Sequence, residues 1–374
     1  MDDKEISALT MANSGMILNW KGLEPTADKH STGGIGDKIT LLFVPLIAAY
    51  GINVPKLSGR SLGITGGTID KLESIRGFKT NLTVEQIKEQ VKRIGLAICS
   101  ASGDLAPADK KLYAIRDVTG TVDSIPLIAS SIMSKKIAGG AQNIILDVKY
   151  GAGALMKSLE DAKLLARTMV IIGKNLKKNI KAIISNMNQP LGYAIGNVLE
   201  IKEVMEVLNG KEVSDLVELT ICLTREAIVG AGCQPALDDE LKEILLGGKA
   251  LKKFEEMVVA QGGDLKASLE TTKYVEILKS ESDSYIQDIN PFFVGEVVHA
   301  LGAGRKSVSD QIDHSVGILL HKKYGDKVRI GEPLLEIHAR SKEDAEIAKR
   351  KLSSALKFGQ KEPSKLKLVQ EIVS

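Results

Sequence analysis

Apolar and polar residues follow two patterns along this chain, one typical of buried strands and the other of helices. Short β-prone apolar runs at residues 52–57, 143–148 and 181–185 predict strands. Residues 160–176 carry acidic side chains in the first turn and apolar ones at helical spacing, which predicts a helix. Strands that alternate with helices are typical of a mainly parallel sheet covered by helices, so the sequence predicts an α/β fold.

The pattern differs in two further parts of the chain. Residues 108–137 have a helical pattern, interrupted by a turn at 119–126. After about Asp288 the chain has short β-like runs separated by turns such as Tyr324-Gly-Asp and Ile330-Gly-Glu-Pro. We therefore expect a helical part and a small β-rich C-terminal part beside the α/β part.

A glycine-rich segment at residues 29–40, Lys-His-Ser-Thr-Gly-Gly-Ile-Gly-Asp-Lys-Ile-Thr, is the strongest candidate for chemistry. Its glycines allow successive N–H groups to turn toward one anion, and its lysine and hydroxyls add donors. The apolar run at 39–50 predicts a helix whose positive N-terminal end faces the same anion. The glycines alone would equally suit an ordinary turn before a buried helix.

A second loop, residues 56–70, also mixes glycines with hydroxyls and cations and follows a predicted strand. Loops at strand ends in α/β folds commonly bind ligands, so two such loops predict one shared phosphate site. Neither loop has the Walker or the Rossmann pattern, which disfavours nucleotide hydrolysis and hydride transfer.

Composition narrows the class of protein. A chain of 374 residues predicts two or three domains, and a net charge of only +3 gives no basic stripe for nucleic acid. The longest apolar run is shorter than the roughly 20 residues of a membrane span, and the first residues do not form a signal peptide. We expect a soluble, cytoplasmic protein whose Cys99, Cys222 and Cys233 are packing residues.

Several motifs together resemble the thymidine and pyrimidine-nucleoside phosphorylases in the order in which they occur. They are the 29–37 segment, Ser58-Gly-Arg, Thr65-Gly-Gly-Thr-Ile-Asp-Lys-Leu-Glu, Pro107-Ala-Asp-Lys-Lys-Leu-Tyr-Ala-Ile-Arg-Asp-Val-Thr-Gly-Thr, Ser130-Ser-Ile-Met-Ser-Lys-Lys, Asp147-Val-Lys, Gln189-Pro-Leu-Gly and Leu301-Gly-Ala-Gly-Arg. The resemblance covers nearly the whole chain. It implies a helical domain (1–24 and 105–141) across a cleft from an α/β phosphate-binding domain (25–104 and 142–287), followed by a β-rich domain (288–374).

The resemblance also implies a reaction, phosphate-dependent cleavage of uridine, thymidine or deoxyuridine to free base and (deoxy)ribose 1-phosphate. Its phosphate ligands would be Lys29, Ser31, Thr40, Lys56, Ser58 and Thr68. Its pyrimidine-binding residues would be Arg116, Ser131 and Lys135. The 131 and 135 positions lie one helical turn apart, on one face.

His30 is the expected proton donor. A side chain that titrates near neutrality suits protonation of a departing base, and the matching histidine of the family lies at the pyrimidine O2. Arg116 and Lys135 would stabilise the negative charge that develops on the base. A histidine bonded only to loop backbone, an Arg116 paired with Asp109 or Asp117, and a solvated Lys135–Lys136 face are the structural alternatives.

The resemblance further implies a structural potassium ion and a homodimer. The ion would be held by carbonyl oxygens and one carboxylate at Gly36, Lys38, Leu191, Ala194 and Glu203. Some relatives have Thr in place of Lys38. If this residue contributes only its carbonyl the site survives, but a side-chain hydroxyl ligand would be lost.

Other positions depart from the family pattern. Ile64 replaces a histidine and Ser61 a glycine, and both would alter the wall near the sugar and base. Leu155 replaces a common phenylalanine and would enlarge the base pocket. Met1–Gly15 matches an internal family helix, so we expect a shortened member without the usual helical leader, and less active for that reason.

Within the family, broad pyrimidine-nucleoside phosphorolysis is favoured over strict action on thymidine. An anthranilate phosphoribosyltransferase-like enzyme is the alternative reaction, but it would require an acidic pair for pyrophosphate-bound magnesium, and the sequence offers none that suits. A degenerate, non-catalytic paralogue is the alternative class, and the presence of His30, Arg116 and Lys135 argues against it.

Overall fold

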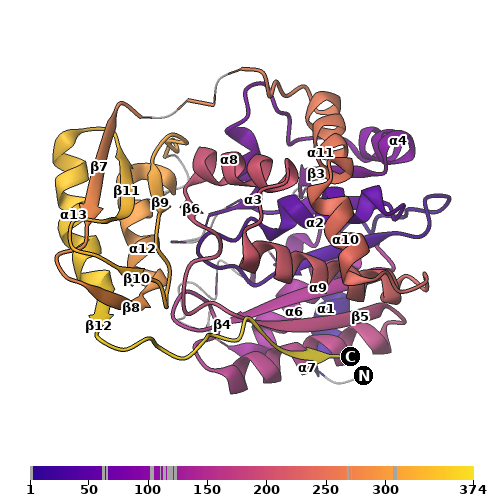
Figure 1. The fold of residues 1–374 in the computed structure, drawn as a ribbon. Coiled ribbons are helices and arrows are strands. Elements are labelled where there is room, and N and C mark those ends of the chain that lie inside the picture. The colour runs from indigo at the N-terminus through magenta and orange to yellow at the C-terminus, as the bar shows by residue number, and fades with distance from the viewer. Residues whose placement is uncertain are drawn as a thin grey trace.

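The protein combines an α/β part built on a parallel sheet with a smaller antiparallel part (Figure 1). This computed structural model describes residues 3–60, 64, 66–101, 105–109, 111–112, 115, 121, 124–267, 269–270, 272–305 and 310–374. The predicted fold class is confirmed. Among the described residues, no helix has both the length and the apolar character needed to span a bilayer.

The central sheet has the order β1-β4-β5-β13. Its strands are β1 (Ala27–Ser31), β4 (Asn143–Tyr150), β5 (Asn179–Asn186) and β13 (Val369–Val373). The first three are parallel, and β13 pairs antiparallel with β5. A two-stranded parallel sheet, β2 (Val54–Ser58) with β3 (Leu96–Ser100), is connected to β1 by a bridge between Thr26 and Asn53. The three predicted strands therefore exist, each within about two residues of its expected bounds.

Helices cover both faces of the central sheet (Figure 1). The helices of the α/β part are α1 (Asp3–Asn13), α2 (Ile39–Ala49), α3 (Thr68–Glu73), α4 (Val84–Ile94), α6 (Ile125–Ala138), α7 (Leu159–Asn175), α8 (Asn197–Leu208), α9 (Ser214–Gly230), α10 (Asp238–Leu246) and α11 (Lys249–Ala260). Alternate residues of β4 separate two cores, because Ile144 packs with α1, α6 and α7 whereas Ile145 packs with α2 and α9. The predicted 160–176 helix is α7.

The antiparallel part consists of two small sheets. The larger has the order β6 (Ala194–Ile195), β9 (Gly317–Leu320), β11 (Pro333–Ala339) and β7 (Tyr274–Lys279), and the smaller has β10 (Lys327–Val328), β8 (Ser284–Ile289) and β12 (Leu356–Gly359). The helices α12 (Pro291–Val298) and α13 (Lys342–Ala355) pack on them, and a π-helical turn (His299–Ala303) follows α12.

Two strands that precede the expected range of 288–374 also pair within these antiparallel sheets. They are β6 and β7, the second of which begins at Tyr274. The last strand of the chain lies outside the antiparallel sheets. The yellow C-terminal segment in Figure 1 runs back to the α/β part and adds β13 to the central sheet. Strand partners decide this boundary, and they are remote in the sequence.

Candidate active site

The short strand β1 distributes its polar side chains over two faces. Because successive residues of a strand point to opposite sides, Lys29 and Ser31 share one face while Asp28 and His30 share the other. β1 lies beside β4 in the sheet, and a bridge between residues 26 and 53 connects its start to β2. The glycine-rich segment begins within β1 and leads into α2, which is the helix predicted after it.

On one face, Lys29 lies in a buried ionic network. Its Nζ is 3.3 Å from Asp147 Oδ2, 4.0 Å from Asp37 Oδ1 and 3.4 Å from Thr40 Oγ1, and its side chain is fully buried. The Ser31 hydroxyl donates a 2.5 Å hydrogen bond to Asp37. Three of the expected phosphate residues thus surround Asp37 and Asp147 here.

Lys149 supplies the second positive charge of this network. Its Nζ donates to Asp147 Oδ2 at 2.8 Å and lies 3.7 Å from Asp37 Oδ2. Burial opposes the charge on Asp37, but Lys149 and Lys29 outweigh it and hold the pKa of that carboxyl well below its ordinary range. Two lysines thus face two carboxylates, and the network is neutral as a whole.

On the opposite face, two buried lysines share one carboxylate. We call Asp28, His30, Lys56 and Lys136 the Lys56 site. Lys56 Nζ lies 3.2 Å from Asp28 Oδ1, and Lys136 Nζ donates to Asp28 Oδ2 at 2.6 Å. Burial, opposed in part by Asp28 but reinforced by Lys136 and Lys29, lowers the pKa of Lys56 to about 7. Positive charge therefore exceeds negative charge in a buried place, which is how an anion site is built.

His30 is surrounded by cations. Burial and the charges of Lys136, Lys56, Lys135 and Lys29 lower the pKa of His30 well below its ordinary value. At neutral pH its imidazole is therefore uncharged in the ligand-free protein.

The helix α6 brings two adjacent lysines to different places. Lys136 is buried against Asp28, whereas Lys135 is half exposed and its Nζ lies 2.7 Å from Asp109 Oδ2. Lys135 Nζ also donates to Ser131 Oγ at 3.0 Å, so the expected i, i+4 pair is in contact. Since Lys135 also acts on the pKa of His30, α6 contributes its cations to the surroundings of β1.

Ser131 lines a cavity of about 210 Å³ between α1, α6 and the residues around Leu112. Asp109, the partner of Lys135, is also part of its wall. The remaining walls are largely apolar, contributed by Met11, Ile115 and Leu127 among others. A mostly apolar hollow with few polar groups is typical of a small-ligand site, although this one is smaller than most.

The other expected residues are less fully described. Ser58 is the last residue of β2 and is buried, and Thr68 is the first residue of α3. Both lie at the ends of the second glycine-rich loop. Arg116 and Ser61 lie outside the described residues.

The five residues expected to hold potassium come together in three dimensions, but a lysine ammonium lies at their centre. Lys38 Nζ donates to Leu191 O at 3.1 Å, to Ala194 O at 2.8 Å and to Glu203 Oε2 at 2.5 Å. We call Lys38 and these three partners the Lys38 site. Gly36 adjoins it, because a Cβ added there would lie 2.4 Å from Leu191 O.

These oxygen atoms cannot also bind a potassium ion beside the Lys38 ammonium group. The carbonyl and carboxylate oxygens that would bind the ion already accept from the ammonium group, and a second cation among them would be repelled. Lys38 therefore brings its ammonium group to the place expected for the ion, which a contribution of its carbonyl alone would have left open. Residue spacing says where the backbone of Lys38 lies but not where its four-carbon side chain ends.

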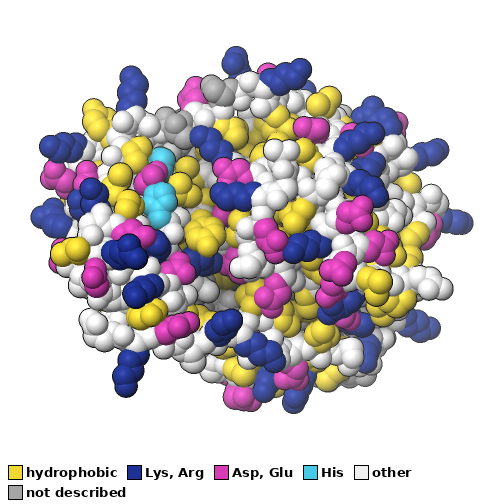
Figure 2. Space-filling model, viewed as in Figure 1, with side chains coloured by type: hydrophobic (Ala, Val, Ile, Leu, Met, Phe, Trp, Pro, Cys, Tyr) yellow, Lys and Arg dark blue, Asp and Glu magenta, His cyan; other side chains and the backbone are white. Residues whose placement is uncertain are grey.

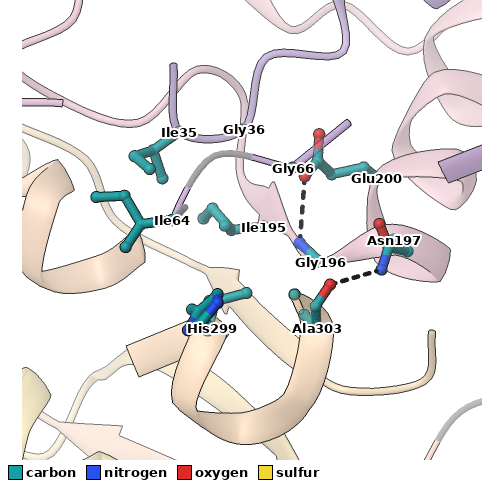
Figure 3. Close-up of a pocket in the computed structure, with 12 residues that line it drawn as sticks. Ile35, Gly36, Ile64, Gly66, Ile195, Gly196, Asn197, Glu200, His299 and Ala303 are labelled. Atoms are coloured by element: carbon teal, nitrogen blue, oxygen red, sulfur yellow. Dashed lines mark hydrogen bonds between the residues drawn. The ribbon is translucent and has the colours of Figure 1, made fainter. Parts of the chain in front are cut away.

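A small hollow of about 20 Å³ lies where the α/β part meets the π-helical turn (Figure 3). Gly196 N donates to Glu200 beside it, and Asn197 donates to Ala303 O. The hollow has room for about one water molecule and not for a nucleoside. Ile64 lines it and packs against the core of the antiparallel part, while Leu155 is 38% exposed.

Sequence reasoning gave no individual role to Asp28, Asp37, Lys136, Asp147 or Lys149, although these residues build the charged surroundings of β1. One signal was available for two of them. Asp147 and Lys149 lie two residues apart in a strand that is otherwise apolar, so both charges point to the same buried face. Charges in such a place are paired or functional.

Two family models match the chain. Residues 23–251 match the glycosyl transferase family, a/b domain, and residues 285–359 match the pyrimidine nucleoside phosphorylase C-terminal domain. The first match covers the residues of the described site, and the second lies in the antiparallel part.

Curated relatives match over nearly the whole chain. A pyrimidine-nucleoside phosphorylase of Staphylococcus haemolyticus (strain JCSC1435) is 49% identical over 96% of this chain and 85% of its own length. One of Bacillus subtilis (strain 168) is 49% identical over 93% of this chain and 83% of its own length.

A solved structure, the anthranilate phosphoribosyltransferase of Thermus thermophilus, has a similar fold. It matches with a TM-score of 0.53 at 18% sequence identity, over 69% of this chain and 84% of its own. At that identity the likeness concerns the fold alone.

Proposed function

The chain belongs to the pyrimidine-nucleoside phosphorylase family, and we propose that the surroundings of β1 carry out its reaction, phosphorolysis of pyrimidine nucleosides. Phosphate is the co-substrate of such an enzyme, a glycosyltransferase of the pentosyl type. A phosphate oxygen attacks C1′ of the sugar, the C1′–N bond breaks, and its electron pair leaves with the base. The products are the free base and a sugar 1-phosphate.

One observation supports a phosphate site at β1: Lys56 and Lys136 are both buried and share the single carboxylate of Asp28. A phosphate dianion would supply the missing negative charge. We propose that the phosphate binds beyond the end of β1, within reach of both faces of the strand, because the charge of Lys29 on one face also acts on Lys56 on the other. Its ligands would come from the two glycine-rich loops and the strands before them, namely Lys29, Ser31, Thr40, Lys56, Ser58 and Thr68. Lys29 and Ser31 would have to exchange part of their contact with Asp147 and Asp37 for contact with phosphate.

His30 would act as proton donor only when phosphate is present. In the ligand-free protein, burial and the neighbouring lysines hold its pKa well below the ordinary value, so the imidazole is neutral and is a poor general acid. Two negative charges nearby would offset those lysines and raise the pKa of His30. The imidazole would then protonate, or hydrogen-bond, the pyrimidine as the bond to C1′ breaks.

We assign the base to the α6 side of the cleft. Ser131 and Lys135 are in contact on one face of α6, and Ser131 lines the largely apolar cavity. Together with Arg116 they would donate to the pyrimidine carbonyl oxygens and stabilise the developing anion, as an oxyanion hole does.

We propose a broad substrate range that includes uridine, thymidine and deoxyuridine rather than thymidine alone. The test is release of uracil and thymine from their nucleosides, measured side by side with and without phosphate. Release of both bases, only with phosphate, supports the proposal, and release of thymine alone favours the strict enzyme. No release of either base from folded protein would identify a degenerate paralogue.

We further propose that the enzyme is a cytoplasmic homodimer that binds no nucleic acid. On the face seen in Figure 2, Lys and Arg side chains intermingle with Asp and Glu instead of forming one basic patch, which supports the last point. Light scattering of the purified protein tests the dimer. Potassium has no part in this proposal, because the Lys38 ammonium lies where the ion was expected.

A further inference from the structure

The Lys38 side chain ends in a shell of oxygen atoms. Leu191 O, Ala194 O and Glu203 Oε2 all lie within 3.1 Å of its Nζ, and the side chain is fully buried. A lysine ammonium has three N–H donors, and this shell offers one acceptor for each of them. The charge is matched as well, since one carboxylate faces one ammonium.

The backbone around the shell is shaped for close approach. A Cβ on Gly192 would lie 2.5 Å from Glu203 Oε2 and 2.8 Å from Lys38 Nζ, and Gly192 has a φ of +65°. Gly36 has a φ of +71° and lets the first glycine-rich segment contact Leu191. Only glycine suits either position, because a side chain would meet both a steric and a conformational barrier.

The shell connects segments that are far apart in the sequence. Lys38 directly precedes α2, and Glu203 lies in α8. Leu191 lies shortly before β6, and Ala194 is the first residue of that strand. Leu191 N also donates to Ile35 O at 3.0 Å, so the first glycine-rich segment is held to this segment at two points. A single cationic group at the centre of this oxygen shell therefore holds the loop between β1 and α2 against the segment around Leu191.

We propose that the Lys38 ammonium is a built-in substitute for a bound monovalent cation, so that this protein holds its first glycine-rich segment in place without potassium. The Glu203 carboxylate, whose Oε2 lies 2.5 Å from Lys38 Nζ, pairs with the ammonium charge inside the fold. Lys38 is then a positioning residue. It acts on the loop and does not touch a substrate.

The wild-type protein gives the first test. It is dialysed free of potassium and melted in KCl, NaCl and tetramethylammonium chloride at equal ionic strength. We expect the same Tm in all three salts. A specific potassium site held at about 100-fold its Kd would instead raise Tm by several degrees. A rise in KCl alone would overturn the proposal.

The Lys38→Thr variant gives the second test, because it removes the ammonium and leaves the oxygen shell. We expect a lower Tm than wild type in NaCl and a partial recovery that is specific to KCl. The matched control is Lys181→Thr, which removes a partly buried lysine that lies 2.6 Å from Glu226, and it should lose stability equally in every salt. A folded Lys38→Thr protein without any preference for KCl would overturn the proposal.

If Lys38→Thr does not stay folded without potassium, refolding from urea in KCl and in NaCl replaces the melt. Recovery in KCl alone supports the proposal, and equal recovery or none in either salt counts against it. Wild-type turnover in tetramethylammonium phosphate should equal that in potassium phosphate. This last measurement alone depends on the proposed function: absence of turnover in both salts would contradict phosphorolysis and leave the melting result standing.

Discussion

Lys38 and Lys56 are both buried lysines, yet their surroundings shift their pKa values in opposite directions. At the Lys38 site, one ammonium meets one carboxylate and two carbonyl oxygens, and the pKa of Lys38 is raised despite burial. At the Lys56 site, two ammonium groups share Asp28, and the pKa of Lys56 falls to about 7.

This contrast separates a structural charge from a functional one. A buried ion pair whose donors and acceptors are all satisfied leaves nothing for a ligand to do. A buried cluster with one cation too many is incomplete, and a ligand of opposite charge completes it. By that criterion the Lys38 site has a structural role, whereas the Lys56 site can bind an anion.

The largest effect is expected within the Lys56 site, at His30. His30→Ala should lower turnover by roughly 10²–10⁴-fold, because a general acid contributes that much to a bond-breaking step. Phosphate affinity and thermal stability should change little. Turnover in phosphate is compared with that of His321→Ala, which removes a partly exposed histidine paired with Glu336. Turnover like wild type in folded His30→Ala would remove His30 from the mechanism.

Removal of the acidic partner tests the contrast directly. Asp28→Asn and Glu203→Gln should each lower the free energy of unfolding by about 3–5 kcal/mol, since each leaves buried lysine charge unpaired. Only Asp28→Asn should regain stability when phosphate is added, because its lysines face the proposed anion site. Urea unfolding with and without phosphate measures both. Recovery of Glu203→Gln by phosphate would mean that the two sites do not differ as described.

The lowered pKa of Lys56 predicts a link between phosphate and protons. Its pKa is about 7 in the folded protein against an ordinary 10.5, so the side chain is mostly neutral at pH 8. A bound dianion would raise that pKa, so binding at pH 8 should take up protons, and affinity should fall by at most about tenfold per pH unit above 7. Calorimetry in two buffers of different ionisation enthalpy measures the uptake.

Lys56→Met is the control for this linkage and should remove the proton uptake. The stability of the ligand-free protein has a matching pH dependence. Between about pH 7 and 10.5 the unfolded chain binds more protons at Lys56 than the folded one, so this group makes stability rise with pH in that window. Binding without proton uptake by the wild type would contradict the assigned pKa.

Sequence patterns predicted the parts of this protein that are set locally. The strands β2, β4 and β5 follow from runs of apolar residues, and the glycine-rich segment between β1 and α2 follows from composition. The pairing of β7 with β11 and the return of β13 to β5 join segments that are remote in the sequence. No local pattern carries that information.

The candidate site shows the same limit at the level of side chains. Lys38 has an expected place in a motif, but the oxygen atoms that its ammonium reaches lie more than 150 positions away in the sequence. Lys135 and Lys136 are adjacent and chemically identical. Which of them is buried depends on the face of α6 that packs toward β1, so only the structure distinguishes them.

That difference between adjacent lysines gives the prediction with the smallest expected effect on phosphate. Lys135→Ala should impair cleavage of the pyrimidine nucleoside and change the phosphate Kd by less than about twofold, because a half-exposed charge paired with Asp109 contributes little at a distance. Lys136→Met, one residue further, removes a buried cation of the Lys56 site and should weaken phosphate binding strongly. Calorimetric titration of both variants with phosphate decides the matter. Equal losses of affinity in the two would mean that Lys135 belongs to the anion site and that the excess of charge beside Asp28 is not what binds phosphate.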